Sequence, residues 1–414
     1  MYIISVMKGF GRLGVWFVTY FIITVAFLDT MAQLPILAPF IASLGASGAY
    51  AGLILGSYSF FNMVGNLAAG PAIDRYGRRA GIVAGMLIAG IAVASYAIAA
   101  RPGHLLGFRI LHGLGGAILI PAVFAYAGDA TRSGTIGRSM GFAGAAVAVA
   151  ALVGPALGGI GRVMFGPRPV FVALGVLLIL TAFVALVSVR DTAARRRTGD
   201  EPVAGGDAVI VRGPRGVRFF ASVLRDPSLQ YAYLSVFSLT FATGALAMVF
   251  PMTIEAAGLS AAHTGSYFGI YAIAAILVFV LPTNRLSDAF GRRPAIVAGS
   301  VLVVAALGLL TVAGGRPAFT VAMVLYGFGY GTMFPALCAT VVDRTTVDRR
   351  GTAFGVFYAV FSLGTFVGPV VAGAVAQTVV SPYWAAVGVF IVVRGVLSAR
   401  HFTAQPSAEA HAES

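Results

Sequence analysis

Long apolar stretches recur along the whole chain and limit its folding more than any other feature. Twelve of them can be marked, at 14–41, 48–70, 80–100, 104–128, 135–160, 168–189, 230–254, 262–283, 294–314, 317–342, 352–377 and 382–402. Each reaches the length of about 20 residues that a helix needs to cross the hydrocarbon core of a bilayer. A helix also satisfies its own backbone polar groups there. The sequence therefore predicts an all-α membrane protein with twelve transmembrane helices.

The composition excludes several other classes of protein. Hydrophobic residues make up 59% of the 414 residues and charged residues 10%, whereas a soluble domain carries about 25% charged residues. These values exclude an ordinary soluble enzyme, a secreted disulfide scaffold and a disordered chain. The single cysteine, Cys338, cannot form an internal disulfide. The first stretch is too long for a cleavable signal peptide.

The net charge of +14 reflects membrane topology rather than nucleic-acid binding. The 28 basic residues sit in short clusters between the apolar stretches, not on one face of a folded domain. Twelve spans put both termini on one side, and that side receives most of these residues. The positive-inside rule places it in the cytoplasm. We therefore expect a multi-pass protein of the cell (inner, cytoplasmic) membrane with both termini cytoplasmic, the lipid bilayer as a partner and no nucleic-acid partner.

An internal repeat divides the chain into two similar halves. A shift of 214 residues, without gaps, places Asp74, Gly77, Arg78 and Arg79 on Asp288, Gly291, Arg292 and Arg293. Two halves of six spans have the same orientation, so they form parallel repeats with a site near the membrane midplane between them. We expect two pseudo-symmetric six-helix bundles around a central cavity: an N-terminal bundle over 1–189, a cytoplasmic linker over 190–229, a C-terminal bundle over 230–402 and a cytoplasmic tail over 403–414. Within the linker, 217–224 forms either a short surface helix or part of a plain tether.

Three further motifs carry a family resemblance. The loop GPAIDRYGRRAG at 70–81 resembles the signature loop between the second and third helices of the major facilitator superfamily, and NRLSDAFGRRPA at 284–295 resembles its second-half copy, with Asn284 in place of the usual glycine. Arg109-Ile-Leu-His-Gly113 resembles the arginine motif of the fourth helix, with His112 where Gln is common. The segment FLDTMAQLPILAPFIASLG at 27–45 is similar to the first helix of twelve-helix drug:proton antiporters, and Asp29 occupies the place of their acidic residue.

The two signature loops have an implied gating role at the cytoplasmic side. Their residues are Gly70, Asp74, Arg75, Gly77, Arg78, Arg79, Asp288, Gly291, Arg292 and Arg293. Gly77 and Gly291 permit a tight turn between antiparallel helices. A carboxylate at Asp74 can accept hydrogen bonds from a helix end or pair with arginine. The alternative is an anchor that fixes topology without gating.

Two Gly-Pro stretches resemble the fifth-helix signature of the superfamily's antiporters, with Ala150 in place of one glycine. The matching residues are Gly141, Gly154, Pro155, Gly158 and Gly159 in the first half, and Gly355, Gly364, Gly368, Pro369 and Gly373 in the second. The prolines bend their helices and the glycines permit close helix packing. The resemblance implies that this packing seals the pathway against proton leak; ordinary kinked packing is the alternative.

Asp29 is the strongest candidate for proton coupling. It is the only acidic residue deep within a predicted span, and an intramembrane carboxylate is a functional hypothesis by default. Burial favours the neutral form of a carboxyl group, so such a group can take up and release a proton. Gln33 lies on the same helix face. An ion pair with Arg109, three residues before His112, would offset the cost of burying both charges. The alternative is that this ion pair is static and takes up no proton.

The remaining candidates line a substrate cavity. They are Gln33, Tyr58, Asn62, His112, Tyr267, Tyr271, Tyr326, Tyr330 and Tyr358. The repeat places Asp29 on Thr243 and Arg109 on Met323, so ionisable chemistry is concentrated in the first half while the second half is rich in tyrosine. Aromatic faces bind flat lipophilic or cationic compounds. Helix packing or lipid contact is the alternative for each of them.

These features predict a secondary active transporter that works by alternating access. The first hypothesis is a proton-coupled antiporter, acting as a monomer, that exports small lipophilic or cationic compounds. The second is uptake or export of one metabolite, such as a sugar or siderophore. The third, a membrane enzyme or sensor, lacks a catalytic constellation, a metal-ligand spacing or a phosphate loop. We therefore expect no enzymatic activity, no cofactor and no metal, and expect protons and a small molecule as partners.

Overall fold

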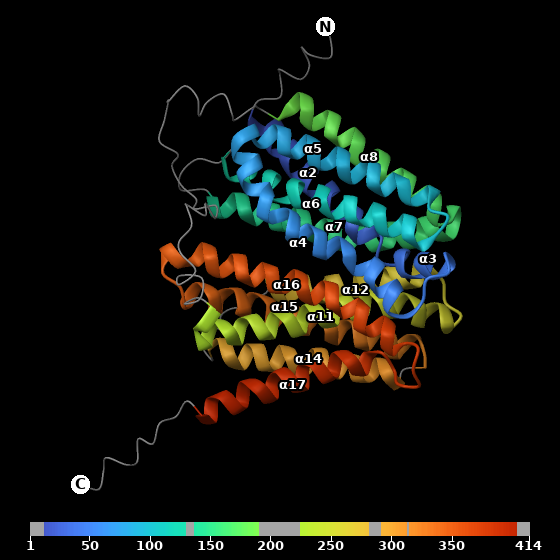
Figure 1. Ribbon diagram of the computed structural model, residues 1–414, viewed down its shortest axis with the longest axis vertical. Coiled ribbons are helices and arrows are strands. Elements are labelled where there is room, and N and C mark those ends of the chain that lie inside the picture. Colours follow the sequence, from blue (N-terminus) through green and yellow to red (C-terminus); the bar gives the residue numbers. More distant parts are fainter. Residues whose placement is uncertain (1–11, 130–135, 190–223, 281–290, 313, 404–414) are drawn as a thin grey trace, which may run out of the picture.

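The computed structural model (Figure 1) describes residues 12–129, 136–189, 224–280, 291–312 and 314–403. Its α-helices are α2 (Arg12–Ala32), α3 (Leu37–Ser43), α4 (Gly48–Tyr76), α5 (Arg78–Ser95), α6 (Pro102–Asp129), α7 (Ile136–Phe165), α8 (Pro167–Ser188), α11 (Pro227–Ala256), α12 (Ala261–Val280), α14 (Arg292–Val312), α15 (Arg316–Asp343), α16 (Val347–Val375) and α17 (Tyr383–Thr403). A short 3₁₀ helix, η1 (Tyr96–Ile98), follows α5. The predicted linker residues 190–223 and loop residue Asp288 lie outside the described residues.

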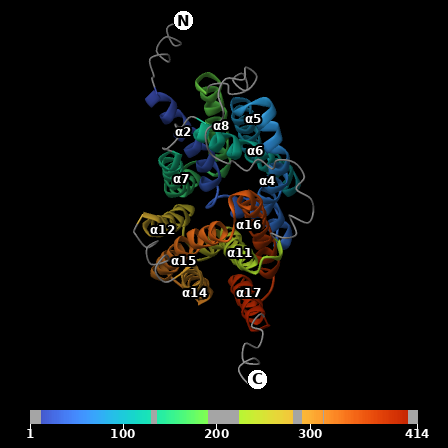
Figure 2. The same cartoon turned by 90° about the vertical axis from the view of Figure 1, so that its left-hand side faces the viewer.

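The long helices form two bundles of six. Helices α2 and α4 to α8 make the first bundle, and α11, α12 and α14 to α17 make the second, as both views show (Figures 1 and 2). The described residues contain no strand. The predicted fold class, an all-α membrane protein with two six-helix bundles, is confirmed.

The helix limits repeat with the same shift as the sequence. Helix α6 covers Pro102–Asp129 and α15 covers Arg316–Asp343, which are the same positions 214 residues apart. Helices α5 and α14 begin at Arg78 and Arg292, the matching arginines of the two signature loops. Gly77 and Gly291, one residue earlier, have φ values of 92° and 89°. Because this left-handed region is costly for residues with a Cβ, the predicted turn role of both glycines has a backbone reason.

The first predicted span, 14–41, is not one straight helix. It breaks after α2 and resumes at α3 with a bend of 45°. Pro35 lies in the break and has no N–H to continue the helix ladder. The carbonyl of Gln33 instead accepts from the N–H groups of Ile36 and Leu37, at 3.0 and 2.9 Å. The break places Asp29 in the last turn of α2, where the helix ends inside the protein.

Most helices are apolar enough to cross a bilayer unaided. Within the described residues, nine pass a test of length and hydropathy, and the bent α2–α3 pair makes a tenth. Helix α4 is not among them because it carries Ser57, Tyr58, Asn62 and Asn66. In α17 the described apolar part is shorter, Tyr383–Leu397. The polar residues of α4 therefore mark it as a helix that faces protein or water.

The two bundles touch at one end, which we call the Arg162 end. There α4 packs on α16 and α7 packs on α12. A Cβ added at Gly52 would overlap the carbonyl oxygen of Pro369, so only glycine permits this approach of α4 to α16. Arg162 on α7 pairs with Glu255 on α11 and donates to the carbonyl oxygen of Pro35 at 3.2 Å.

At the opposite end, the Arg78 end, the bundles are apart. The helix faces that meet at the Arg162 end continue towards the Arg78 end as exposed surface. Leu67 on α4 is 81% exposed and Tyr358 on α16 is 52% exposed. Cβ atoms at Gly141 on α7 and Gly355 on α16 would meet no atom within 4 Å. A crevice between the bundles therefore opens at the Arg78 end and is closed at the Arg162 end.

Candidate functional site

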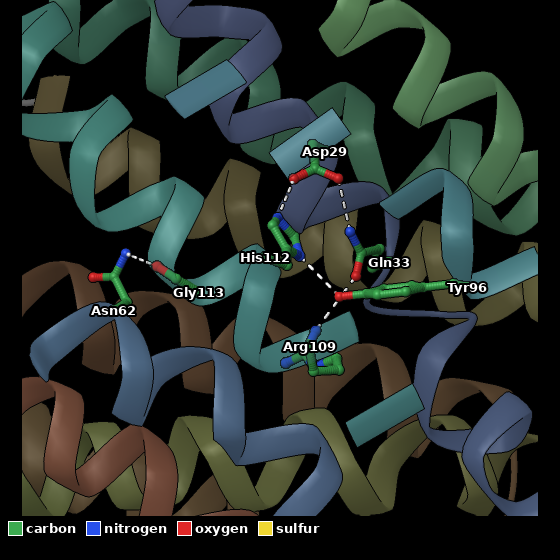
Figure 3. Close-up of polar contacts among 7 residues, drawn as sticks. All are labelled: Asp29, Gln33, Asn62, Tyr96, Arg109, His112 and Gly113. Carbon is green, nitrogen blue, oxygen red and sulfur yellow. Dashed lines mark hydrogen bonds and ion pairs between the residues drawn. The ribbon is translucent and has the colours of Figure 1, made fainter. Parts of the chain in front are cut away.

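A buried polar network lies inside the first bundle (Figure 3). Asp29 is 3% exposed, Gln33 2% and His112 1%. One carboxylate oxygen of Asp29 accepts from the Gln33 amide at 2.7 Å, and the other lies 2.8 Å from Nε2 of His112. Buried polar groups need such partners, and both oxygens of the carboxylate have one. Of the sequence-predicted residues, these three are brought into direct contact.

His112 has a partner on each ring nitrogen. Its Nδ1 lies 2.9 Å from the hydroxyl of Tyr96, a residue of η1 that is fully buried. An ionised Asp29 requires a proton on Nε2, so Nδ1 of a neutral ring accepts from the phenol. The contacts therefore form a chain of exchangeable hydrogens, phenol to imidazole to carboxylate. Tyr96 was not predicted from the sequence, because it stands at the end of an apolar span without a motif.

Arg109 does not pair directly with Asp29, and this part of the prediction is wrong. Its guanidinium donates to the carbonyl oxygens of Ile54 (3.1 Å) and Leu55 on α4 and lies 3.4 Å from Oε1 of Gln33. Gln33 thus bridges the two charges, using its amide nitrogen for Asp29 and its oxygen for Arg109. The physical reason is that both carboxylate oxygens of Asp29 already have partners. His112, three residues further along the same face of α6, bonds one oxygen and Gln33 bonds the other.

Tyr58 of α4 covers this network on one side, and Asn62, one turn further along α4, lies apart from it (Figure 3). The Tyr58 ring centroid lies 4.6 Å from that of His112 and 5.4 Å from the guanidinium carbon of Arg109. The Asn62 amide donates to the carbonyl oxygen of Gly113 at 3.5 Å (Figure 3). Both residues are partly exposed. Tyr58 is thus a sequence-predicted cavity residue that adjoins both the buried network and accessible surface.

The second bundle repeats the central contact in neutral form. The shift of 214 places Asp29 on Thr243 and His112 on Tyr326, and the hydroxyls of Thr243 and Tyr326 lie 3.1 Å apart. Met323, at the place of Arg109, is fully buried. The two bundles therefore share the geometry of this contact, but only the first forms it from a carboxylate and an imidazole.

Most of the predicted tyrosines of the second bundle form an aromatic cluster. The Tyr271 ring lies 5.5 Å from Tyr326 and 5.8 Å from Tyr330. The cluster continues from Tyr330 through Phe334 and Phe361 to Tyr358, with centroid distances of 5.6, 6.1 and 6.3 Å. It runs from the bundle interior to the exposed Tyr358. Tyr267 is apart from it, buried against Phe250 and Phe319.

The signature loops form ion pairs within each bundle. Arg78 donates to Asp74 at 2.7 Å and to Asp129 at 3.3 Å. Arg292 repeats the second contact with Asp343 at 3.0 Å. Of the other loop residues, Arg75 lies over Tyr76, Arg79 donates to the carbonyl oxygen of Leu186, and Gly70 is exposed. Each of these ion pairs joins residues of the same bundle.

The glycines of the Gly-Pro stretches fall into two groups. Cβ atoms would overlap backbone of a neighbouring helix at Gly158, Gly159, Gly368 and Gly373, and would crowd it at Gly154 and Gly364, whereas Gly141 and Gly355 have open space. Gly158 approaches Ala32, directly before the break in the first span. Pro155 and Pro369 are both buried, next to Gly265 and Gly52 of the opposite bundle.

Two parallel six-helix bundles, the first of which holds a buried carboxylate, define a multi-pass membrane carrier. A sequence profile described as Major Facilitator Superfamily matches residues 19–281 and again 232–413. Because the two matches together span residues 19–413, this protein belongs to the major facilitator superfamily.

Relatives and solved structures agree with this assignment. The chain is 24% identical to "Multidrug resistance protein 1" of Bacillus subtilis, over 84% of this chain and 86% of the relative. It is 23% identical to "Quinolone resistance protein NorA" of Staphylococcus aureus, over 90% and 93%. A point mutant of the nucleoside transporter NupG superposes with a TM-score of 0.78 at 13% identity, over 93% and 99%. A bacterial homologue of the lysosomal transporter Spinster, inward-facing and unoccupied, gives 0.73 at 18%, over 94% and 93%.

Proposed function

We propose that this protein is a proton-coupled antiporter that exports small lipophilic or cationic compounds by alternating access. Its relatives are named for multidrug and quinolone resistance, which supports export of such compounds. The observation that carries proton coupling is the buried Asp29–His112 contact, whose counterpart in the second bundle is neutral. The arginine clusters support a cytoplasmic Arg78 end with both termini on that side.

The chemistry of the proton step follows from the network. With Asp29 ionised and His112 neutral, the charges of Asp29 and Arg109 balance. One added proton, on either partner of the Asp29–His112 contact, leaves a net positive charge in a buried site, where electrostatic interactions are strong. A cationic substrate and this proton then disfavour each other, so that one leaves as the other binds.

For a neutral substrate the membrane potential gives this exchange a direction, whereas exchange of one proton for one monovalent cation moves no net charge and is driven by the pH gradient. One proton entering down 100 mV supplies about 2.3 kcal/mol, enough to sustain a concentration ratio of about fiftyfold for one exported neutral molecule. In the structure the crevice opens at the Arg78 end, the proposed cytoplasmic side, where the substrate would enter. The aromatic cluster that ends at Tyr358 would bind the flat, apolar part of the substrate. A positive charge on the substrate would lie against the faces of these rings.

A susceptibility panel tests the proposed function. Expression in a drug-sensitive bacterial host should raise the inhibitory concentration of lipophilic cations such as ethidium, and leave that of small hydrophilic compounds unchanged. In everted vesicles, adding ethidium should dissipate a preformed proton gradient. Uptake into whole cells, or a response limited to one sugar or siderophore, would contradict it.

Substitutions at His112 test which group carries the proton. We expect His112→Gln to retain pH-dependent export, because an amide can still donate to Asp29. His112→Leu should lower export roughly tenfold, since it leaves a buried carboxylate oxygen and the Tyr96 hydroxyl without this partner, at a cost of about 1–3 kcal/mol. Proton release in everted vesicles at a series of pH values measures both. Equal inactivity of the two variants would instead assign the transported proton to His112.

A further inference from the structure

A polar cavity lies at the Arg78 end of the second bundle, away from the crevice and from Asp29. It has a volume of about 470 Å³ and lies between α11, α14 and α15. Its polar lining includes Tyr231, Arg292, Arg293, Thr340, Asp343 and Arg344. No step of the proposed transport uses this cavity.

Tyr231 is in contact with two arginines, Arg293 and Arg394, and we call these residues, with Arg292 and Arg344 of the cavity lining, the arginine cluster. Arg394 of α17 donates to its hydroxyl oxygen at 2.6 Å. The guanidinium carbons of Arg293 and Arg394 lie 5.4 and 5.5 Å from the centre of its ring. Because the hydroxyl oxygen accepts from Arg394, the phenol hydrogen is available to donate, and the described part of the chain offers it no acceptor.

The arginine cluster has an excess of positive charge among its described residues. Arg394 lies within an apolar helix, and its hydrogen bonds go to neutral groups: Tyr231, the carbonyl oxygen of Ile296 (3.1 Å) and the Ser300 hydroxyl (2.7 Å). Among the described lining residues, the carboxylate of Asp343 contacts Arg292. Nearby, Asp226 accepts from two N–H groups at the start of α11. Among the residues that the structure describes here, the guanidinium groups therefore outnumber the carboxylates, and an anion would complete the site.

The first bundle lacks this arrangement, although it has the same signature loop. The shift of 214 places Arg292, Arg293 and Asp343 on Arg78, Arg79 and Asp129, which are the same residue types. It places Tyr231, Ser300, Arg344 and Arg394 on Phe17, Met86, Ala130 and Leu180. Four polar residues of the second bundle thus replace four apolar ones. Neither the loop turn nor membrane orientation needs them, because the first bundle has both without them.

The cavity adjoins surface that faces lipid. Helices α14 and α17 lie on the side of the second bundle away from the first, in both views (Figures 1 and 2). Val297 and Val301, one and two turns along α14 from Arg293, are 44% and 61% exposed. Ile391 and Val392 of α17 are 63% and 65% exposed. A phosphate at the arginines would therefore leave room for acyl chains along these side chains.

We propose that this cavity binds the headgroup phosphate of an anionic phospholipid of the adjacent membrane leaflet. Arginine donates paired hydrogen bonds to phosphate oxygens, and the Tyr231 hydroxyl supplies one more donor. Basic cavities between transmembrane helices at the cytoplasmic side are suited to anionic headgroups. The apolar surface at Val297 and Val301 favours a lipid over a free anion, and the excess positive charge favours an anionic lipid over a zwitterionic one.

Native mass spectrometry of the purified full-length protein tests this site. Phosphatidylglycerol should be retained in preference to phosphatidylcholine of the same chain length. Arg344→Gln and Tyr231→Phe should each weaken phosphatidylglycerol binding, the first by roughly fivefold, as expected for one arginine near a membrane surface. Arg344 is exposed and Tyr231→Phe keeps the ring, so both variants should fold. Arg316→Gln, at the opposite end of α15, is the matched control and should change nothing.

Two results would overturn the proposal. The first is equal retention of the two lipids, or phosphatidylglycerol binding that neither cavity variant weakens. The second is displacement of bound phosphatidylglycerol by millimolar inorganic phosphate, which would make this a site for a soluble anion. The assay does not involve proton movement, so failure of the proposed antiport would leave its outcome unchanged.

Discussion

Asp29→Asn should abolish pH-dependent export while leaving the protein in the membrane. Asparagine has nearly the same shape as aspartate and can keep contacts with both Gln33 and His112, but it cannot take up a proton. The variant also removes the negative charge opposite Arg109, so the site becomes permanently positive and should disfavour a cationic substrate. Proton release on ethidium addition to everted vesicles should fall to the level of vesicles that lack the protein.

The matched control is Asp226→Asn. It also removes one carboxylate from the start or end of a helix, but Asp226 lies at the N-terminus of α11, where it accepts from Ser228 and Leu229. Asparagine is an equally good residue for that role, so expression and transport should persist. If Asp29→Asn exports as well as the parent protein and still moves protons, Asp29 does not couple transport to protons. The family assignment does not depend on this result.

Much of the fold could be predicted because the sequence contains it twice. The unbroken shift of 214 required matching helices, and α6 and α15 match to the residue. The bend in the first span escaped prediction because hydropathy measures apolar length and not direction. Pro35 and Pro39 were visible, but a proline in an apolar stretch is compatible with a mild kink as well as with a break.

The residues of the network were more predictable than its contacts. Asp29, Gln33 and His112 stood out as polar residues in apolar spans, and a spacing of four residues placed the first two on one face. The choice between Arg109 and His112 as partner of Asp29 depends on side-chain reach across three helices, which residue spacing does not contain. Tyr96 was missed for a different reason: it stands near the end of an apolar stretch, where polar residues are ordinary. Arg394 was missed although it lies inside the twelfth predicted span, 382–402.

The closed Arg162 end leads to the second large expected effect. Gly373→Ala should destabilise the state in which this end is closed. Its Cβ would overlap the carbonyl oxygen of Gly48 on α4, and backbone cannot rotate away as a side chain can. Inserting one methyl group into a tight contact costs about 1–3 kcal/mol, which corresponds to a population shift of between about fivefold and about 150-fold.

Cross-linking of two introduced cysteines measures this shift directly. The Gln377 amide donates to the Ser47 hydroxyl at 3.3 Å across the closed end, so cysteines at both positions, with Cys338→Ala, should be joined by a short bismaleimide cross-linker. Gly373→Ala should reduce that yield and transport together, because alternating access needs both states. Gly355→Ala lies on the same helix with no atom within 4 Å of its new Cβ and should leave the yield unchanged. If both variants cross-link like the parent, the glycines of α16 do not hold the end closed. Their part in the cycle would then belong to the state in which the Arg78 end closes.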